Sequence, residues 1–141
     1  MNTYWHNDPW QDPARVYRGV VRAPFQNSIE VVRIDDDTGD TLTRTLDQRH
    51  DVFSHSDGFN WGYGGSGPRQ TALAILCDAV GPHLAMRLYS TFLNAFVSQW
   101  SKDEPFEISL EEIIDWIEDA WWHGYSEVEQ NRSVWQDAGA P

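Results

Sequence analysis

The feature that most constrains this fold is the stretch from His55 to Ala79, HSDGFNWGYGGSGPRQTALAILCDA. Four glycines lie between Trp61 and Pro68. Because glycine loses more backbone entropy on folding than any other residue, this density indicates a turn whose geometry excludes side chains. The segment after Pro68 is apolar on nearly every face, which predicts a helix buried on all sides.

Three segments before this loop have the β-branched, alternating pattern of strands. They are Val16–Ala23, Ile29–Ile34 and Thr41–Leu46. The second and third are separated by the turn-forming run DDDTGD, so we expect them to form an antiparallel hairpin. Strands followed by helices are typical of an α+β domain. The sequence therefore predicts a three-stranded antiparallel sheet with one face available for helices.

Three helices are predicted after the loop. The first has Gly67 as its N-cap, Pro68 at its first position and Gln70 as capping partner, and it ends near Val80. It is expected to be central and buried. The second spans about 82–100 and is expected to bury a set of residues at helical spacing: Leu84, Leu88, Phe92, Ala95 and Phe96.

The third helix opens with a capping box, Ser109-Leu110-Glu111-Glu112. Its apolar residues recur at helical spacing on one face: Leu110, Ile113, Ile114, Ile117 and Trp121. We expect a single domain over residues 15–123, an extended N-terminal arm over 1–14 and a polar C-terminal tail over 124–141. Trp5 and Trp10 in the arm suggest that it docks on this domain or on a second copy, giving a homodimer.

The net charge of −12 is concentrated in the last third of the chain. Residues 103–141 carry 11 acidic side chains and one basic side chain, a net of −10. Such a field repels nucleic acids and anionic membranes and complements basic proteins. There is no apolar run long enough to span a membrane and no signal-peptide pattern, so we expect a cytoplasmic protein.

The glycine loop formally matches the dinucleotide-binding pattern G-x-G-x-x-G. Its context argues against that function, because a second helix follows the first where a parallel strand would be required. No Lys-Ser or Lys-Thr pair follows Gly67, which excludes a P-loop. An anion site made by the loop and the helix start stays open. Its candidate residues are Gly64, Gly65, Ser66, Gly67 and Arg69.

The alternative interpretation is that these glycines allow close packing against large aromatic residues, with Phe59, Trp61 and Tyr63 as core anchors. His50 and His55 match no strong metal-ligand spacing, and Cys77 lies in an apolar helix as a buried thiol. His83 is expected at the surface. We therefore predict no metal, no cofactor and no catalytic residue.

The run WGYGGSGPxQxALAxL, from Trp61 to Leu76, resembles the signature of a family of small uncharacterised bacterial and phage proteins. Tyr17-Arg18-Gly19, His55-Ser56, Phe92 and the Ile113/Trp116 pair fit the same pattern. The chain departs from it at Arg69, Thr71 and Phe106, where Ala, Leu and Trp are expected. The resemblance implies a shared fold and a phage or mobile-element setting, and it carries no catalytic residue over.

The third helix also bears a row of carboxylates opposite its apolar face. The candidate partner-binding residues are Glu111, Glu112, Asp115, Trp116, Glu118, Asp119 and Trp122. With the resemblance, this row predicts a non-enzymatic, anti-CRISPR-like inhibitor that mimics DNA at the basic surface of a host defence complex. Two alternatives stay open: an anion-binding protein or enzyme using the Gly62–Gly67 loop, Arg69 and His55, and a structural protein that oligomerises through its tryptophan-rich termini.

Overall fold

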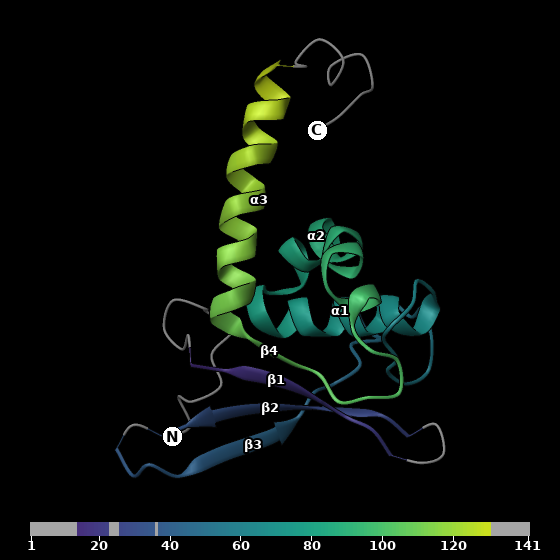
Figure 1. The fold of residues 1–141 in the computed structure, drawn as a ribbon, viewed down its shortest axis with the longest axis vertical. Helices are drawn as coiled ribbons and strands as arrows, with labels where there is room; N and C mark the ends of the chain where they lie inside the picture. Colours follow the sequence, from purple (N-terminus) through teal and green to yellow (C-terminus); the bar gives the residue numbers. More distant parts are fainter. Residues whose placement is uncertain (1–13, 23–25, 36, 131–141) are drawn as a thin grey trace.

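A computed structural model describes residues 14–22, 26–35 and 37–130, with side chains described up to residue 120. Helix α1 lies over one face of an antiparallel sheet, α2 packs on α1 on the side away from the sheet, and α3 rises away from these layers (Figure 1). The predicted arm, apart from its last residue, and residues 131–141 of the predicted tail lie outside the described residues. None of the described helices is long and apolar enough to cross a membrane.

The sheet contains β1 (Val16–Val20), β2 (Ser28–Ile34), β3 (Thr41–Thr45) and β4 (Glu107–Ser109) in the order β3-β2-β1-β4. The prediction of an antiparallel sheet is confirmed, but the predicted number of three strands is wrong. The fourth strand, β4, pairs with β1 through Tyr17↔Ile108. It has only three residues and one apolar side chain, so it lacks a local strand pattern and exists because β1 provides its hydrogen-bonding partner.

The two faces of the sheet differ in polarity. Tyr17, Ile29 and Val31 are fully buried beneath the helices. On the outer face, Arg18 donates a hydrogen bond to Glu107 at 3.2 Å and stands opposite Glu30 in the β1–β2 register. The alternation of the strands therefore buries one face of the sheet under the helices and leaves an outer face of mixed polarity, on which Val32 is also buried.

Helix α1 (Ser66–Val80) is central and buried, as predicted, but its start is not where the sequence suggested. Gly65 is the N-cap, so Gly67 and Pro68 lie inside the first turn. Helix α2 (Pro82–Ala95) is shorter than predicted and is followed by a 3-10 turn, η1 (Val97–Gln99). Phe96 leaves helical geometry there, and the Val97 carbonyl accepts a hydrogen bond from Gly62 N–H at 3.0 Å.

The buried face of α2 also differs from the predicted one. Phe92 is fully buried, Leu84, Leu88 and Phe96 are half-buried, and Ala95 is exposed. Ala85 and Leu93 are buried in addition. The core-facing stripe of α2 is thus displaced from the predicted one.

Helix α3 (Leu110–Gln130) begins with the predicted capping box. Glu112 N–H donates to Ser109 Oγ at 3.0 Å, and Ser109 N–H donates to Glu112 Oε1 at 3.2 Å. Leu110 and Ile113 are fully buried. The helix continues to Gln130, through residues 124–130 of the segment predicted as a tail.

Candidate interaction surface

The acidic face of α3 consists of exposed carboxylates opposite its buried stripe. Its members are Glu111, Glu112, Asp115, Glu118 and Asp119, and all are exposed. At about 100° per residue they cover an arc of roughly 120° centred opposite Ile113 and Ile117. The two sides of the helix are therefore separated: one packs in the core and the other is exposed to solvent.

One member of the acidic face also has a structural role. Glu112 is part of the capping box, so its carboxylate satisfies the backbone N–H of Ser109. Glu111 and Glu112 both lie in the first turn, where negative charge interacts favourably with the helix dipole. Asp115 and Glu118 lie beyond that turn, so neither capping nor the helix dipole explains why these positions are acidic.

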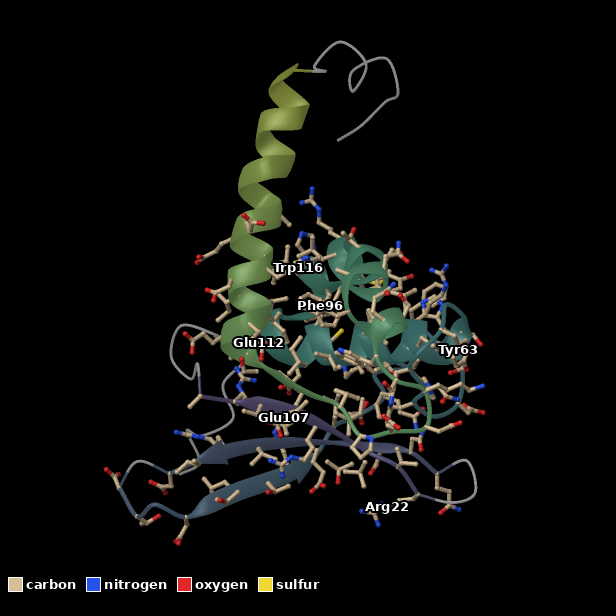
Figure 2. The ribbon with its side chains drawn as sticks, in the orientation of Figure 1. Arg22, Tyr63, Phe96, Glu107, Glu112 and Trp116 are labelled. Carbon is tan, nitrogen blue, oxygen red and sulfur yellow. The ribbon has the colours of Figure 1, made fainter. Side chains whose placement is uncertain are left out.

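Trp116 occupies a different position from the acidic face. Its ring lies 5.5 Å from the ring of Phe92 and 5.8 Å from that of Phe96, with edge-to-face geometry in both pairs. Figure 2 shows Trp116 and Phe96 between α3 and α2. Trp116 thus fixes α3 to α2 and is half-buried. The side chain of the other predicted contact tryptophan, Trp122, lies outside the described residues.

The glycines of the glycine loop, residues 59–67, differ in how closely neighbouring atoms approach them. Gly62 has a φ of +90°, and a Cβ there would lie 2.6 Å from Lys102 Cα. A Cβ on Gly67 would lie 2.8 Å from Asn60 Cβ, and one on Gly65 would lie 2.9 Å from Tyr63 Cε2. A Cβ on Gly64 would meet nothing within 4 Å. Close packing therefore explains Gly62 and Gly67, whereas the contact at Gly65 is with the exposed ring of Tyr63.

The aromatic residues of this loop have two different roles. Phe59 and Trp61 are core anchors, as predicted, and Trp61 Nε1–H donates to Glu104 O at 2.7 Å. Tyr63 is 38 % exposed, so its prediction as a core anchor is wrong. Its ring lies over the loop glycines, and Lys102 Nζ lies 5.3 Å from the ring centroid. In Figure 2 this tyrosine lies on the side of the domain away from α3.

The five candidate anion-binding residues differ in exposure. Gly64, Ser66 and Arg69 are exposed, Gly65 is half-buried and Gly67 is buried. No side chain in the described part of the chain caps the start of α1. The geometry thus gives the loop a packing role, and the anion-binding hypothesis receives no further support from it.

Gln70, predicted as a capping partner, instead organises the loop before α1. Its Oε1 accepts from the N–H groups of His55 at 2.6 Å and Ser56 at 3.3 Å. Its Nε2 donates to Gln48 O at 2.7 Å and Phe53 O at 3.0 Å. Gln70 is fully buried, and this one amide satisfies four backbone groups of that loop.

The cysteine and the three histidines whose side chains are described lie in different surroundings. His50 Nε2 lies 2.8 Å from Ser56 O, and His55 Nε2 lies 3.0 Å from Tyr89 Oη. His83 is exposed, as predicted. Cys77 is fully buried, and burial raises the pKa of its thiol to about 11. Among the residues whose side chains are described, no group of three or more His, Cys, Asp or Glu is placed to hold a metal ion.

The sequence matches a family of unknown function, DUF6166, over residues 17–119. The chain belongs to this family. The matched segment runs from β1 into α3 and includes both the glycine loop and the acidic face. No curated protein and no solved structure shows significant similarity to the chain.

The family segment also contains most of a buried ion cluster that the sequence did not reveal. Asp78, in the last turn of α1, accepts from Arg15 Nη1 at 2.9 Å and from Tyr17 Oη at 2.7 Å, and it pairs with Arg44 on β3. Burial and the Asp78 charge raise the pKa of Tyr17. The partners are 34 to 63 residues from Asp78 in sequence, so no local pattern could have identified them.

Proposed function

We propose that this protein is a non-enzymatic interaction protein whose α3 acidic face binds a basic surface on another protein. The observation that carries the proposal is the exposure of five carboxylates on one side of a helix whose other side is buried in the core. Their charge lies within a segment, residues 103–141, that has a net charge of −10. A basic partner is the electrostatic complement of such a surface.

The shape of the domain supports the same proposal. Helix α3 projects beyond α1 and α2 along the long axis of the molecule (Figure 1). Glu111, Asp115 and Glu118 follow one another at about one residue per helical turn, or about 5.4 Å along the axis. This row lies on the first part of α3, where Glu112 is seen beside α1 (Figure 2), so a basic groove can dock along the outer side of the helix.

The narrower proposal is that the groove normally holds nucleic acid, within a host defence complex such as a CRISPR effector, and that the protein has a phage or mobile-element origin. Nucleic-acid-binding grooves are lined with lysine and arginine that neutralise phosphates. A row of carboxylates would compete for these groups. Binding would then exclude the nucleic acid without any chemical step.

The test uses two variants with the same change in net charge. Asp115→Lys with Glu118→Lys reverses the centre of the acidic face, whereas Asp57→Lys with Glu104→Lys reverses exposed charges elsewhere. Zero-length carbodiimide cross-linking in a nuclease-treated host lysate should join residues 111–119 to lysines of a partner. We expect the α3 variant to lose the cross-linked product and the control variant to keep it.

The narrower proposal is tested with a purified, guide-loaded CRISPR complex and labelled target DNA. The protein should block DNA binding, and the α3 variant should do so at least about tenfold less well. Equal inhibition by the two double variants would contradict a role for the acidic face. Unimpaired DNA binding at saturating protein would contradict the narrower proposal, and cross-links only outside α3 would contradict the broader one.

A further inference from the structure

The outer edge of β3 is a second surface with recognisable binding chemistry. Strand β3 stands at the end of the sheet and pairs with β2 in the register Val32↔Thr43. At the two ends of this pairing, Leu46 N–H donates to Ile29 O at 2.7 Å and Asp35 N–H donates to Asp40 O at 2.8 Å. In an antiparallel pair, hydrogen-bonded residues alternate with residues whose backbone groups point away. Leu42 and Arg44 therefore bond to β2.

The backbone groups of the alternate residues, Thr41, Thr43 and Thr45, must then point outward. All three residues are exposed. Within the part of the chain that the structure describes, no hydrogen bond to these outward N–H and C=O groups is formed. Figure 1 shows β3 along the outer side of the sheet, with β2 on its inner side. The edge thus presents a row of donors and acceptors at strand spacing.

Strand β3 also lacks the features that usually protect an edge. Proteins block free edges with exposed charges, proline or bulges. The only charged residue of β3 is Arg44, and its guanidinium turns inward to Asp78 on α1. The three threonines are uncharged and β-branched, which favours pairing with another strand.

The surroundings of this edge are acidic. Asp37 and Asp40 are exposed before β3, and Asp47 is exposed after it. A shallow groove of about 860 Å³ continues from the end of the strand and is lined by residues 45–51. Within it, Arg49 is paired with Asp51 at 2.9 Å, and its backbone N–H donates to Asp47 Oδ1 at 2.7 Å, so Asp47 adds a negative charge that the Arg49–Asp51 pair does not neutralise.

We propose that the outer edge of β3 accepts an extended, lysine- or arginine-containing segment of a partner protein as an additional strand. Backbone hydrogen bonds from Thr41, Thr43 and Thr45 supply the pairing, and the flanking aspartates select for basic side chains. A second copy of this chain fits less well, because antiparallel β3–β3 pairing would bring Asp40 and Asp47 of two strongly acidic molecules together. This surface is separate from the acidic face of α3.

The experiment uses a basic heptapeptide, Lys-Val-Lys-Val-Lys-Val-Lys, as the probe and measures amide hydrogen exchange in the full-length protein at low salt. Exchange at Thr41, Thr43 and Thr45 should slow at least about tenfold when the peptide is saturating. The matched acidic peptide, Glu-Val-Glu-Val-Glu-Val-Glu, should have no effect. A basic peptide N-methylated along its pairing edge should also have none, because it lacks the required donors.

Substitution of the protein provides the second arm. Thr43→Pro removes an outward N–H while leaving the β2-directed groups of Leu42 and Arg44 intact, and it should weaken peptide binding at least about tenfold. Thr43→Val keeps that N–H and should bind normally. The α3 variant Asp115→Lys with Glu118→Lys should also bind normally, so this proposal and the proposed function can fail independently.

Three results would overturn the proposal. The first is unchanged exchange at Thr41, Thr43 and Thr45 at millimolar basic peptide. The second is equal binding of the N-methylated and unmethylated peptides, a comparison that needs no protein variant and holds even if Thr43→Pro fails to fold. The third is protection of these three amides in the absence of peptide, if that protection becomes stronger as the protein concentration is raised. This result would identify a second copy of the chain as the occupant.

Discussion

Helices α1 and α3 use polar side chains in opposite ways. In α1, Gln70, Thr71 and Asp78 point inward and are bonded to the preceding loop or to the sheet. In α3, Asp115 and Glu118 point outward on the face away from the core. Polar groups of the first kind determine the fold, because a buried donor or charge without its partner is costly. Polar groups of the second kind leave the fold nearly unaffected and are free to serve recognition.

The largest expected effect separates these two kinds of carboxylate. Asp78→Ala leaves the fully buried Arg15 and the adjacent Arg44 without their shared acid, and it should destabilise the protein by about 3–5 kcal/mol. Asp115→Ala should change stability by less than about 0.5 kcal/mol. Urea denaturation measures both. Equal losses of stability in the two variants would mean that Asp78 contributes no more to folding than an exposed carboxylate. Asp78→Asn would separate the loss of the charge from the loss of the side-chain shape.

A smaller effect tests the glycine loop that precedes α1. Gly62→Ala must place a Cβ 2.6 Å from the Lys102 backbone and hold an L-residue at a φ of +90°, so it should cost about 2–3 kcal/mol. Gly64→Ala meets open space and should change stability by less than about 0.5 kcal/mol. Thermal unfolding of the two variants measures the difference. Similar losses at both positions would show that the glycines serve something other than packing.

Sequence patterns predicted what depends on neighbours along the chain. Three strands, the α3 capping box and the α1 stop at Gly81 all follow from local periodicity or turn chemistry. The exposure of the acidic face follows from the same helical periodicity that buries Ile113. Physical rules with a range of one or two turns therefore recovered the α+β class and the composition of this face.

The features that the sequence missed depend on distant contacts. Strand β4 is stabilised by β1, about 90 residues earlier, and Gln70 acts on a loop more than one helical turn away. Trp116 lies at the border of the apolar and acidic faces, so only the position of Phe92 and Phe96 decides its role. The same holds for the β3 edge, because a strand pattern does not reveal which side stays unpaired.

The smallest expected effect concerns the pH dependence of the region before α1. Burial, and secondarily the charge of Arg69, lower the pKa of His55 below its ordinary value near 6.5. The unfolded chain then binds the proton more tightly, so stability is retained above about pH 6.5 and is lost as the pH falls through the folded-state pKa. Because His55 is partly exposed, the loss should stay below about 1 kcal/mol.

The measurement is the stability difference between pH 7.5 and pH 5 for wild type, His55→Gln and the matched substitution of an exposed histidine, His83→Gln. His55→Gln should show the shallower dependence, because the remaining carboxylates titrate in all three proteins and cancel in the comparison. An equal slope for His55→Gln and wild type would show that the imidazole is as well solvated folded as unfolded. In that case the polar groups that stabilise the fold would be Asp78 and Gln70, together with the close packing at the loop glycines, and not His55. The expectation for the acidic face of α3 would not change.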